Sequence, residues 1–221
     1  MKKIFLLFTA AALSAGMVFA QDINQATENY NNGAMELNMG NNDAAITYFQ
    51  TALEMAEALG EEGAEVAANC RNIIPAIYLS SAKEQIKAEN YDAAVEQLNK
   101  AIETAGKYEN PEVADDANAL MPQVYLSKGN GFLQAKNFPE AEVAYQKAIE
   151  LDPANGMAYF RLGQVLASQN KVAEAEAAYV QAAANGQEKN ANKQLSTMFV
   201  KLAQAASKAK KYQETIEYAA K

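Results

Sequence analysis

The sequence predicts an all-α fold made of repeated helix–turn–helix units, and three observations carry the prediction. Apolar residues recur at helical spacing in segments such as 66–77 and 113–124. With 11 Gly and 5 Pro in 221 residues, half of them hydrophobic, the chain has too few breakers for a linker-dominated or disordered protein. A set of small and large residues also recurs after 34 positions: Ala141, Tyr145 and Ala148, then Ala175, Tyr179 and Ala182.

The order of residue sizes within this period fits two packed helices. Small residues stand where the helices must approach closely, and large apolar residues such as Tyr159, Leu162 and Leu166 fill the space between them. The period and this order resemble the tetratricopeptide repeat, a helical hairpin of 34 residues. The resemblance covers residues 26–221 and implies a right-handed superhelical solenoid of about four and a half units. It also implies a concave, partner-binding groove lined by the first helix of each unit.

The predicted repeats span about 26–59, 64–107, 111–153, 156–187 and 190–221. Asn29 and Asn32 occupy positions of the first repeat where an aromatic residue and a leucine are expected, so this repeat is predicted to be a polar cap. The second and third repeats are also related directly at an offset of 47, through Pro75 and Pro122, Tyr78 and Tyr125, and the KAIE runs at 100–103 and 147–150.

Extra residues precede the second and third repeats, and their helical spacing predicts first helices lengthened to roughly 25 residues. Pro75 and Pro122 then fall inside these helices, where each is expected to cause a kink or a break. Aromatic residues recur at one repeat position, which predicts that they are core residues of a stacked array: Tyr78, Tyr125, Tyr159 and Phe199.

Residues 1–20 combine Lys2 and Lys3 with an apolar run and with small residues before Gln21. This pattern predicts a secretory signal peptide cleaved before Gln21, and hence a periplasmic or secreted protein. The alternative is an uncleaved membrane anchor, because the apolar run approaches spanning length. No membrane span is expected after cleavage. The single cysteine, Cys70, cannot form an intramolecular disulfide and is interpreted as a small helix-face filler.

Charge and composition exclude several classes of function. Cleavage would leave 17 basic against 27 acidic residues, a net charge of −10, which disfavours nucleic-acid binding. The absence of histidine excludes Ser-His-Asp and Cys-His catalysis and histidine-ligated zinc. No phosphate-binding glycine motif occurs. We therefore expect a protein that is not an enzyme and has no catalytic residues, metal or cofactor.

The resemblance places a partner-binding groove on the first helices of the repeats. Its positions carry no Asp or Glu but several Lys and Arg, which predicts a partner protein or extended peptide with acidic and apolar residues. Asn130 and Arg161 fit the pattern by which one subgroup of the family grips a peptide carboxylate, but Leu126 stands where a lysine is required, so that clamp is incomplete. The predicted groove residues are Tyr30, Lys83, Lys87, Leu126, Asn130, Met157, Phe160, Arg161, Gln164, Val200, Lys201 and Lys208.

The sequence thus predicts a non-catalytic interaction scaffold of the bacterial cell envelope. The alternative is a glycan-binding or nutrient-uptake accessory protein on the same scaffold, although the absence of tryptophan removes one of the usual aromatic platforms. The last predicted helix, KYQETIEYAAK, carries Tyr212, Ile216 and Ala219 on one side. With no helix after it, this side leaves an apolar edge, so self-association through the C-terminal end is a further expectation.

Overall fold

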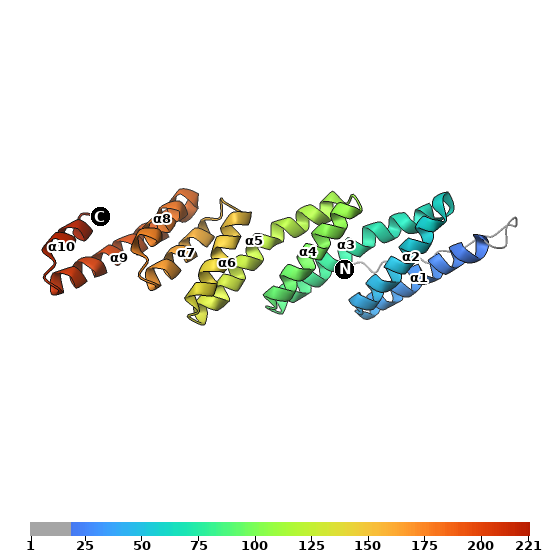
Figure 1. Ribbon diagram of the computed structural model, residues 1–221, viewed down its shortest axis with the longest axis horizontal. Helices are drawn as coiled ribbons and strands as arrows, with labels where there is room; N and C mark the ends of the chain where they lie inside the picture. Colours follow the sequence, from blue (N-terminus) through green and yellow to red (C-terminus); the bar gives the residue numbers. More distant parts are fainter. Residues whose placement is uncertain (1–18) are drawn as a thin grey trace. The chain divides into compact units, whose positions relative to one another are not determined.

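The computed structural model describes residues 19–221, and all the regular structure in that range is helical (Figure 1). Successive α-helices form hairpins, as the sequence predicts. The all-α helical repeat architecture is therefore confirmed. The pairs are α1 (Phe19–Met39) with α2 (Asn42–Ala58), α3 (Ala64–Lys87) with α4 (Tyr91–Lys107), α5 (Pro111–Gln134) with α6 (Phe138–Leu151), α7 (Gly156–Ser168) with α8 (Val172–Ala182), and α9 (Glu188–Lys208) with α10 (Tyr212–Ala219).

The chain divides into two compact units, Met1–Leu120 and Met121–Lys221, with the boundary inside α5. We call them unit 1 and unit 2 and describe each by itself. Within unit 1, α2 is followed by a short 3₁₀ turn, Gly60–Gly63. Within unit 2, α8 runs into a kinked segment, Ala183–Gln187, where Gly186 has a φ of +87°.

The turn inside each hairpin has the same backbone design. One residue adopts left-handed φ, and the next N–H returns to a carbonyl five residues earlier, as in a Schellman motif. The Asn137 N–H, for example, donates to the Phe132 carbonyl at 2.8 Å, and the Lys171 N–H to the Leu166 carbonyl at 3.0 Å. The left-handed residues are Gly40, Glu89, Lys136, Asn170 and Lys210.

The core of unit 1 lies between α1, α2 and α3. Tyr30 meets Phe49 edge to face, with ring centroids 5.2 Å apart. Gly33 lets α1 approach the Phe49 ring, since a Cβ there would stand 3.1 Å from it. Cys70 is fully buried, and desolvation raises the pKa of its thiol to about 12. The thiol therefore stays protonated and packs as a small apolar group, in keeping with its interpretation as a filler.

In the core of unit 2, a glycine of one helix packs against a tyrosine ring of the next, and this contact recurs after 34 residues. A Cβ on Gly129 would stand 2.5 Å from the Tyr145 ring, and one on Gly163 would stand 2.7 Å from the Tyr179 ring. Both tyrosines are almost completely buried. The glycines thus allow α5 and α7 to approach the second helix of their hairpins closely enough to enclose a large ring.

The two long first helices expected from the sequence are confirmed, because α3 and α5 each span 24 residues. Pro75 and Pro122 lie inside them, and neither breaks its helix. Of the two outcomes expected at each proline, the break does not occur, and the kink stays a prediction. Each proline removes the N–H that would bond the carbonyl four residues earlier. Those carbonyls belong to Arg71 and Asn118, which are exposed, so water can take the place of the lost donor.

The first and last hairpins form the ends of the described chain. In the first hairpin, the predicted cap residue Asn29 donates to the Gln25 carbonyl at 2.9 Å. At the other end, Val200, Tyr212 and Ile216 are 53%, 68% and 64% exposed. The predicted signal peptide falls mostly on residues 1–18, which lie outside the described part. Among the helices that the structure describes, none has the length and apolar character needed to cross a membrane.

Candidate partner-binding site

In unit 2, the structure brings three of the predicted groove residues together around one tyrosine. Asn130 is on α5, Arg161 and Gln164 are one turn apart on α7, and Tyr145 is on α6. The Tyr145 hydroxyl donates to Asn130 Oδ1 at 2.9 Å, and Arg161 Nη1 donates to Gln164 Oε1 at 3.0 Å. We call these four residues the Arg161 site.

Burial keeps the tyrosine of the Arg161 site in its neutral form. Burial raises the pKa of Tyr145 to about 12, while the nearby Arg161 guanidinium acts in the opposite direction. Arg161 Nε is buried and has no hydrogen-bond partner among the described residues. Since an arginine side chain does not lose its proton in proteins, the site holds a fixed positive charge that Gln164 orients.

Apolar side chains lie beside this charge on the same helices. Leu126 and Met157 are partly buried and pack against the core of unit 2. Phe160 is only 8% exposed, and its ring lies 5.9 Å from that of Tyr179. Phe160 is thus mainly a core residue, whereas Leu126 and Met157 offer part of their surface to a ligand.

The remaining predicted groove residues are not among the four residues of the Arg161 site. In unit 1, Tyr30 is buried at 6% exposure and does not line a surface. Lys83 is exposed but forms an ion pair with Asp116 at 3.5 Å, so its charge is partly neutralised. The others are exposed residues near the ends or along the length of their helices: Lys87 on α3, and Val200, Lys201 and Lys208 on α9.

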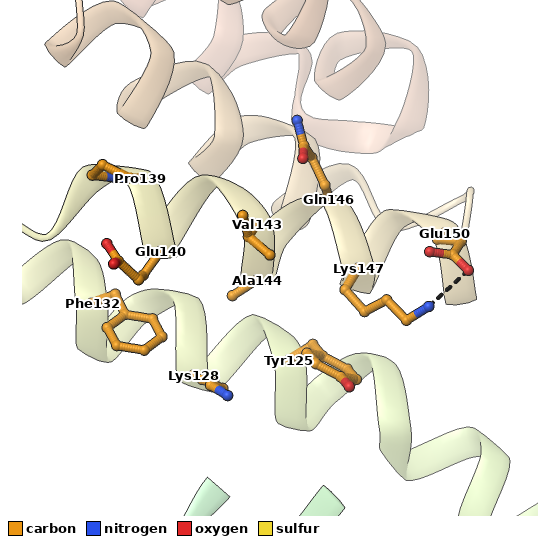
Figure 2. Close-up of a pocket in the computed structure, with 10 residues that line it drawn as sticks. All are labelled: Tyr125, Lys128, Phe132, Pro139, Glu140, Val143, Ala144, Gln146, Lys147 and Glu150. Carbon is orange, nitrogen blue, oxygen red and sulfur yellow. Dashed lines mark hydrogen bonds and ion pairs between the residues drawn. The ribbon is translucent and has the colours of Figure 1, made fainter. Parts of the chain in front are cut away.

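A groove of about 580 Å³ lies on a different face of unit 2, between α5 and α6 (Figure 2). Tyr125, Lys128 and Phe132 project from α5, while Val143 and Ala144 face them from α6. We call it the Tyr125 groove. A second groove, of about 340 Å³, is lined by α6, α7 and α8 and contains Tyr159; we call it the Tyr159 groove.

These grooves correct one prediction from the sequence. The recurring Tyr78, Tyr125 and Tyr159 are only half-buried, and among these aromatic positions only Phe199 is buried. One side of Tyr159 packs on the core of unit 2, and the other lines its groove. The recurrence of these tyrosines correctly indicated that they share one kind of environment. That environment is the edge of the core, not its interior.

Comparison with protein families decides the nature of the repeats. A tetratricopeptide repeat model matches residues 126–192, and a second tetratricopeptide repeat model matches residues 23–59. The chain is a tetratricopeptide repeat protein. Its fold supports a role as a protein–protein interaction scaffold, because stacked repeats expose extended surfaces for partners.

Solved structures similar to this tetratricopeptide repeat protein include three of low sequence identity. MamA is 19% identical with a TM-score of 0.36, over 84% of this chain and 89% of its own. PilF of Pseudomonas aeruginosa is 15% identical with a TM-score of 0.35, over 90% of each chain. Yeast Tom70 is 21% identical with a TM-score of 0.41, over 90% of this chain and 45% of its own. No curated protein sequence matches the chain.

Tyr145 is the residue of the Arg161 site that sequence reasoning missed. In the repeat pattern it is a core residue, equivalent to Tyr179. Its ring fills the space left by Gly129, and its hydroxyl then reaches Asn130 one residue further along α5. The sequence feature that could have predicted this hydrogen bond is the polar Asn130 directly after Gly129. The repeat position of a tyrosine does not by itself show whether its buried hydroxyl has a polar residue within hydrogen-bonding distance.

Proposed function

We propose that this tetratricopeptide repeat protein is a non-catalytic scaffold whose Arg161 site binds an extended partner segment with acidic and apolar residues. The observation that carries the proposal is the arrangement of Arg161, held by Gln164 and adjacent to the Tyr145–Asn130 hydrogen bond. A side chain that is already ordered loses little conformational entropy on binding, so a partner carboxylate gains more from it than from a mobile lysine.

The flanking residues support the same ligand chemistry. Leu126 and Met157 present partly buried apolar surface on α5 and α7, and neither they nor the Arg161 site includes an acidic residue. Further along unit 2, Lys201 and Lys208 are exposed on α9. In unit 1, the pairing of Lys83 with Asp116 makes that lysine a weaker candidate than the sequence suggested. Arg161 therefore carries the proposal.

A tryptophan-containing peptide gives a direct test, because the chain itself has no tryptophan. The probe is a synthetic peptide with two Glu-Leu-Trp-Glu segments, and its own emission reports burial on binding. We expect Arg161→Gln to weaken binding about tenfold, as for the loss of one charge-assisted hydrogen bond. The affinity of the unmodified protein should also fall with added salt.

Lys189→Gln is the matched control for this change. Lys189 is an exposed cation in the first turn of α9, so its replacement alters the net charge equally but lies outside the Arg161 site. It should change the affinity less than twofold. Equal losses from Arg161→Gln and Lys189→Gln would show that binding depends on net charge and would overturn the proposal.

We further propose that the protein is exported to the cell envelope through cleavage of residues 1–20, for which the support is the pattern of Lys2, Lys3 and the apolar run. Mass spectrometry of the protein from a periplasmic or secreted fraction should find an N-terminus at Gln21. A chain that keeps Met1 there would contradict this proposal.

We also propose self-association through the exposed apolar side chains of the last hairpin, Val200, Tyr212 and Ile216, which we call the C-terminal face. Val200 occupies the repeat position of Phe160, which is 8% exposed in a core that includes Ala191 of the following helix. At the C-terminal face, the equivalent surface of Val200 is 53% exposed. A second copy of the chain could cover it by packing helix against helix, and such coverage would remove the exposed apolar area from water.

A further inference from the structure

The Tyr125 and Tyr159 grooves are two copies of one surface, 34 residues apart. Seven of the residues that line the first groove have a counterpart that lines the second. Both grooves lie within unit 2, on either side of α6, and both include Gln146, which points away from α5 in Figure 2. The equivalent pairs are Tyr125 and Tyr159, Lys128 and Leu162, Phe132 and Leu166, Glu140 and Glu174, Val143 and Ala177, Ala144 and Ala178, and Lys147 and Gln181.

In unit 1, the corresponding tyrosine is covered by a lysine. Lys100 Nζ stands over the Tyr78 ring, 6.0 Å from its centroid, and Glu96 holds it by an ion pair of 2.7 Å. Glu96 precedes Lys100 by one helical turn on α4, so the pair has the favourable i,i+4 spacing. The ammonium group thus occupies the space above this tyrosine.

In unit 2, one substitution within the repeat changes this arrangement. Val143 stands 47 residues after Glu96, and Lys147 stands 47 residues after Lys100. Without an acid at position 143, Lys147 pairs with Glu150 at 2.8 Å, as Figure 2 shows. Val143 is 65% exposed, which is high for an apolar residue that lines a groove. The Tyr125 groove therefore presents the apolar side chain of Val143 where unit 1 has an ion pair. Phe132, at the other end of the groove, has Lys128 Nζ over its ring, 5.9 Å from the centroid.

Each groove also carries an acid at the same place on its rim. Glu140 and Glu174 are equivalent residues in the first turns of α6 and α8, and both are exposed. Neither takes part in an ion pair within the described residues. Carboxylates beside an apolar groove complement a cation that flanks an apolar side chain.

We propose that the Tyr125 and Tyr159 grooves together form a docking surface for a second partner, a segment in which two apolar side chains are each flanked by Lys or Arg. The apolar side chains lie against Tyr125 and Tyr159, and the cations reach Glu140 and Glu174. This partner differs in charge from the acidic segment assigned to the Arg161 site, so the scaffold holds two unlike partners on separate surfaces of unit 2.

The spacing of the grooves sets the design of a probe. They flank a single helix, whose diameter is roughly 10 to 12 Å with its side chains. Four extended residues span about 13 Å. The probe is therefore a synthetic peptide with two Lys-Trp-Lys segments joined by a four-residue Gly-Ser linker, read by the emission of its own tryptophans. A peptide with two Gln-Trp-Gln segments and the same linker is the control for charge.

We expect the lysine peptide to bind with a blue shift of its emission, and the glutamine peptide to bind at least tenfold more weakly. Replacing both rim acids, Glu140→Lys with Glu174→Lys, should weaken binding of the lysine peptide at least tenfold. The matched control is Glu28→Lys with Glu84→Lys, which makes the same change in net charge at exposed positions of unit 1 and should cost less than threefold. Similar losses from the two double variants would overturn the proposal.

Val143→Glu separates docking in the groove from general attraction to an acidic protein. It restores at position 143 the acid that unit 1 has at Glu96, so Lys147 can return over Tyr125 and a charge enters the apolar groove. The proposal predicts binding weakened about fivefold or more. General attraction predicts tighter binding, because the variant is more negative, and that result would also overturn the proposal. Arg161→Gln should leave binding of the lysine peptide unchanged, which keeps this test independent of the Arg161 site.

Discussion

At the scale of single residues, Tyr145 links packing to the candidate site. Its ring is enclosed against Gly129, and its hydroxyl donates to Asn130 at 2.9 Å. Because water does not reach the ring, ionisation would place a charge in the core without solvation. The same holds for Tyr179 one repeat later. Burial raises the pKa of this tyrosine to about 12 as well.

This burial predicts a loss of stability at alkaline pH. The pKa of Tyr145 rises from 10.0 to about 12 on folding, so the folded state favours the neutral form. The resulting stability is fully present below pH 10 and is lost as pH rises through about 12. We expect the melting temperature, followed by circular dichroism, to fall over this interval, and Tyr145→Phe to make the fall smaller.

The same variant should lose about 1 kcal/mol at pH 7, because Asn130 loses a hydrogen bond. Tyr212→Phe is the control, since the Tyr212 side chain is 68% exposed and this substitution should leave the stability at pH 7 unchanged. An alkaline transition that Tyr145→Phe leaves unchanged would show that this tyrosine does not contribute. Cys70 in unit 1 adds a contribution of the same sign from pH 9 upward, because its thiol pKa also rises to about 12.

At the scale of helices, the close approach within a hairpin depends on single small residues. Gly129 and Gly131 show this most sharply, because they lie two residues apart on α5 but face different surroundings. A Cβ on Gly129 would meet the Tyr145 ring at 2.5 Å, whereas a Cβ on Gly131 would meet nothing within 4 Å. Helix propensity is the same for both, so the packing decides the difference.

We therefore expect opposite effects from the same substitution at these two positions. Gly129→Ala should destabilise unit 2 by about 1 to 3 kcal/mol through overpacking against Tyr145. Gly131→Ala should stabilise it by about 0.5 to 1 kcal/mol, because alanine loses less backbone entropy than glycine in a helix. Urea denaturation of both variants measures the difference. Effects of equal sign would contradict the packing of α5 against α6.

At the scale of the whole molecule, neighbouring hairpins within each unit pack on one another, α2 on α3 in unit 1 and α6 on α7 in unit 2. In unit 2, Phe160 belongs to a core that α7, α8 and the start of α9 build together. In the last hairpin of the described chain, Val200 at the equivalent position is 53% exposed. The self-association that we propose follows from this difference, because large exposed apolar patches usually mark interaction surfaces.

Ile216→Lys tests this self-association. The side chain is 64% exposed, so a lysine there should not disturb the packing of α10 on α9. We expect the unmodified protein to show a mass by light scattering that rises with concentration, and the variant to remain monomeric over the same range. Glu217→Gln, which makes the same change in net charge at the next exposed position, should keep the concentration dependence. A strict monomer in the unmodified protein would rule the proposal out.

The sequence by itself determined the helical hairpins and their order. Residues that recur after 34 positions, such as Ala141 and Ala175, reflect contacts between neighbouring helices, and such local contacts are written directly into residue spacing. The same reasoning predicted the lengths of α3 and α5, because their apolar residues keep helical spacing through Pro75 and Pro122. Only Asn130, Arg161 and Gln164 of the predicted groove positions were brought together around one side chain.

Only the tertiary structure decided which of the recurring residues are exposed to solvent and which are buried. Tyr30 is enclosed by Phe49, and Lys83 is paired with Asp116, although both occupy positions where a groove residue was predicted. Tyr125 and Tyr159 line grooves, although their recurrence predicted a core. The physical reason is that exposure depends on the sizes and charges of neighbours on other helices. Lys100 stands over Tyr78 and pairs with Glu96, whereas beside Tyr125 the position equivalent to Glu96 is held by the apolar Val143.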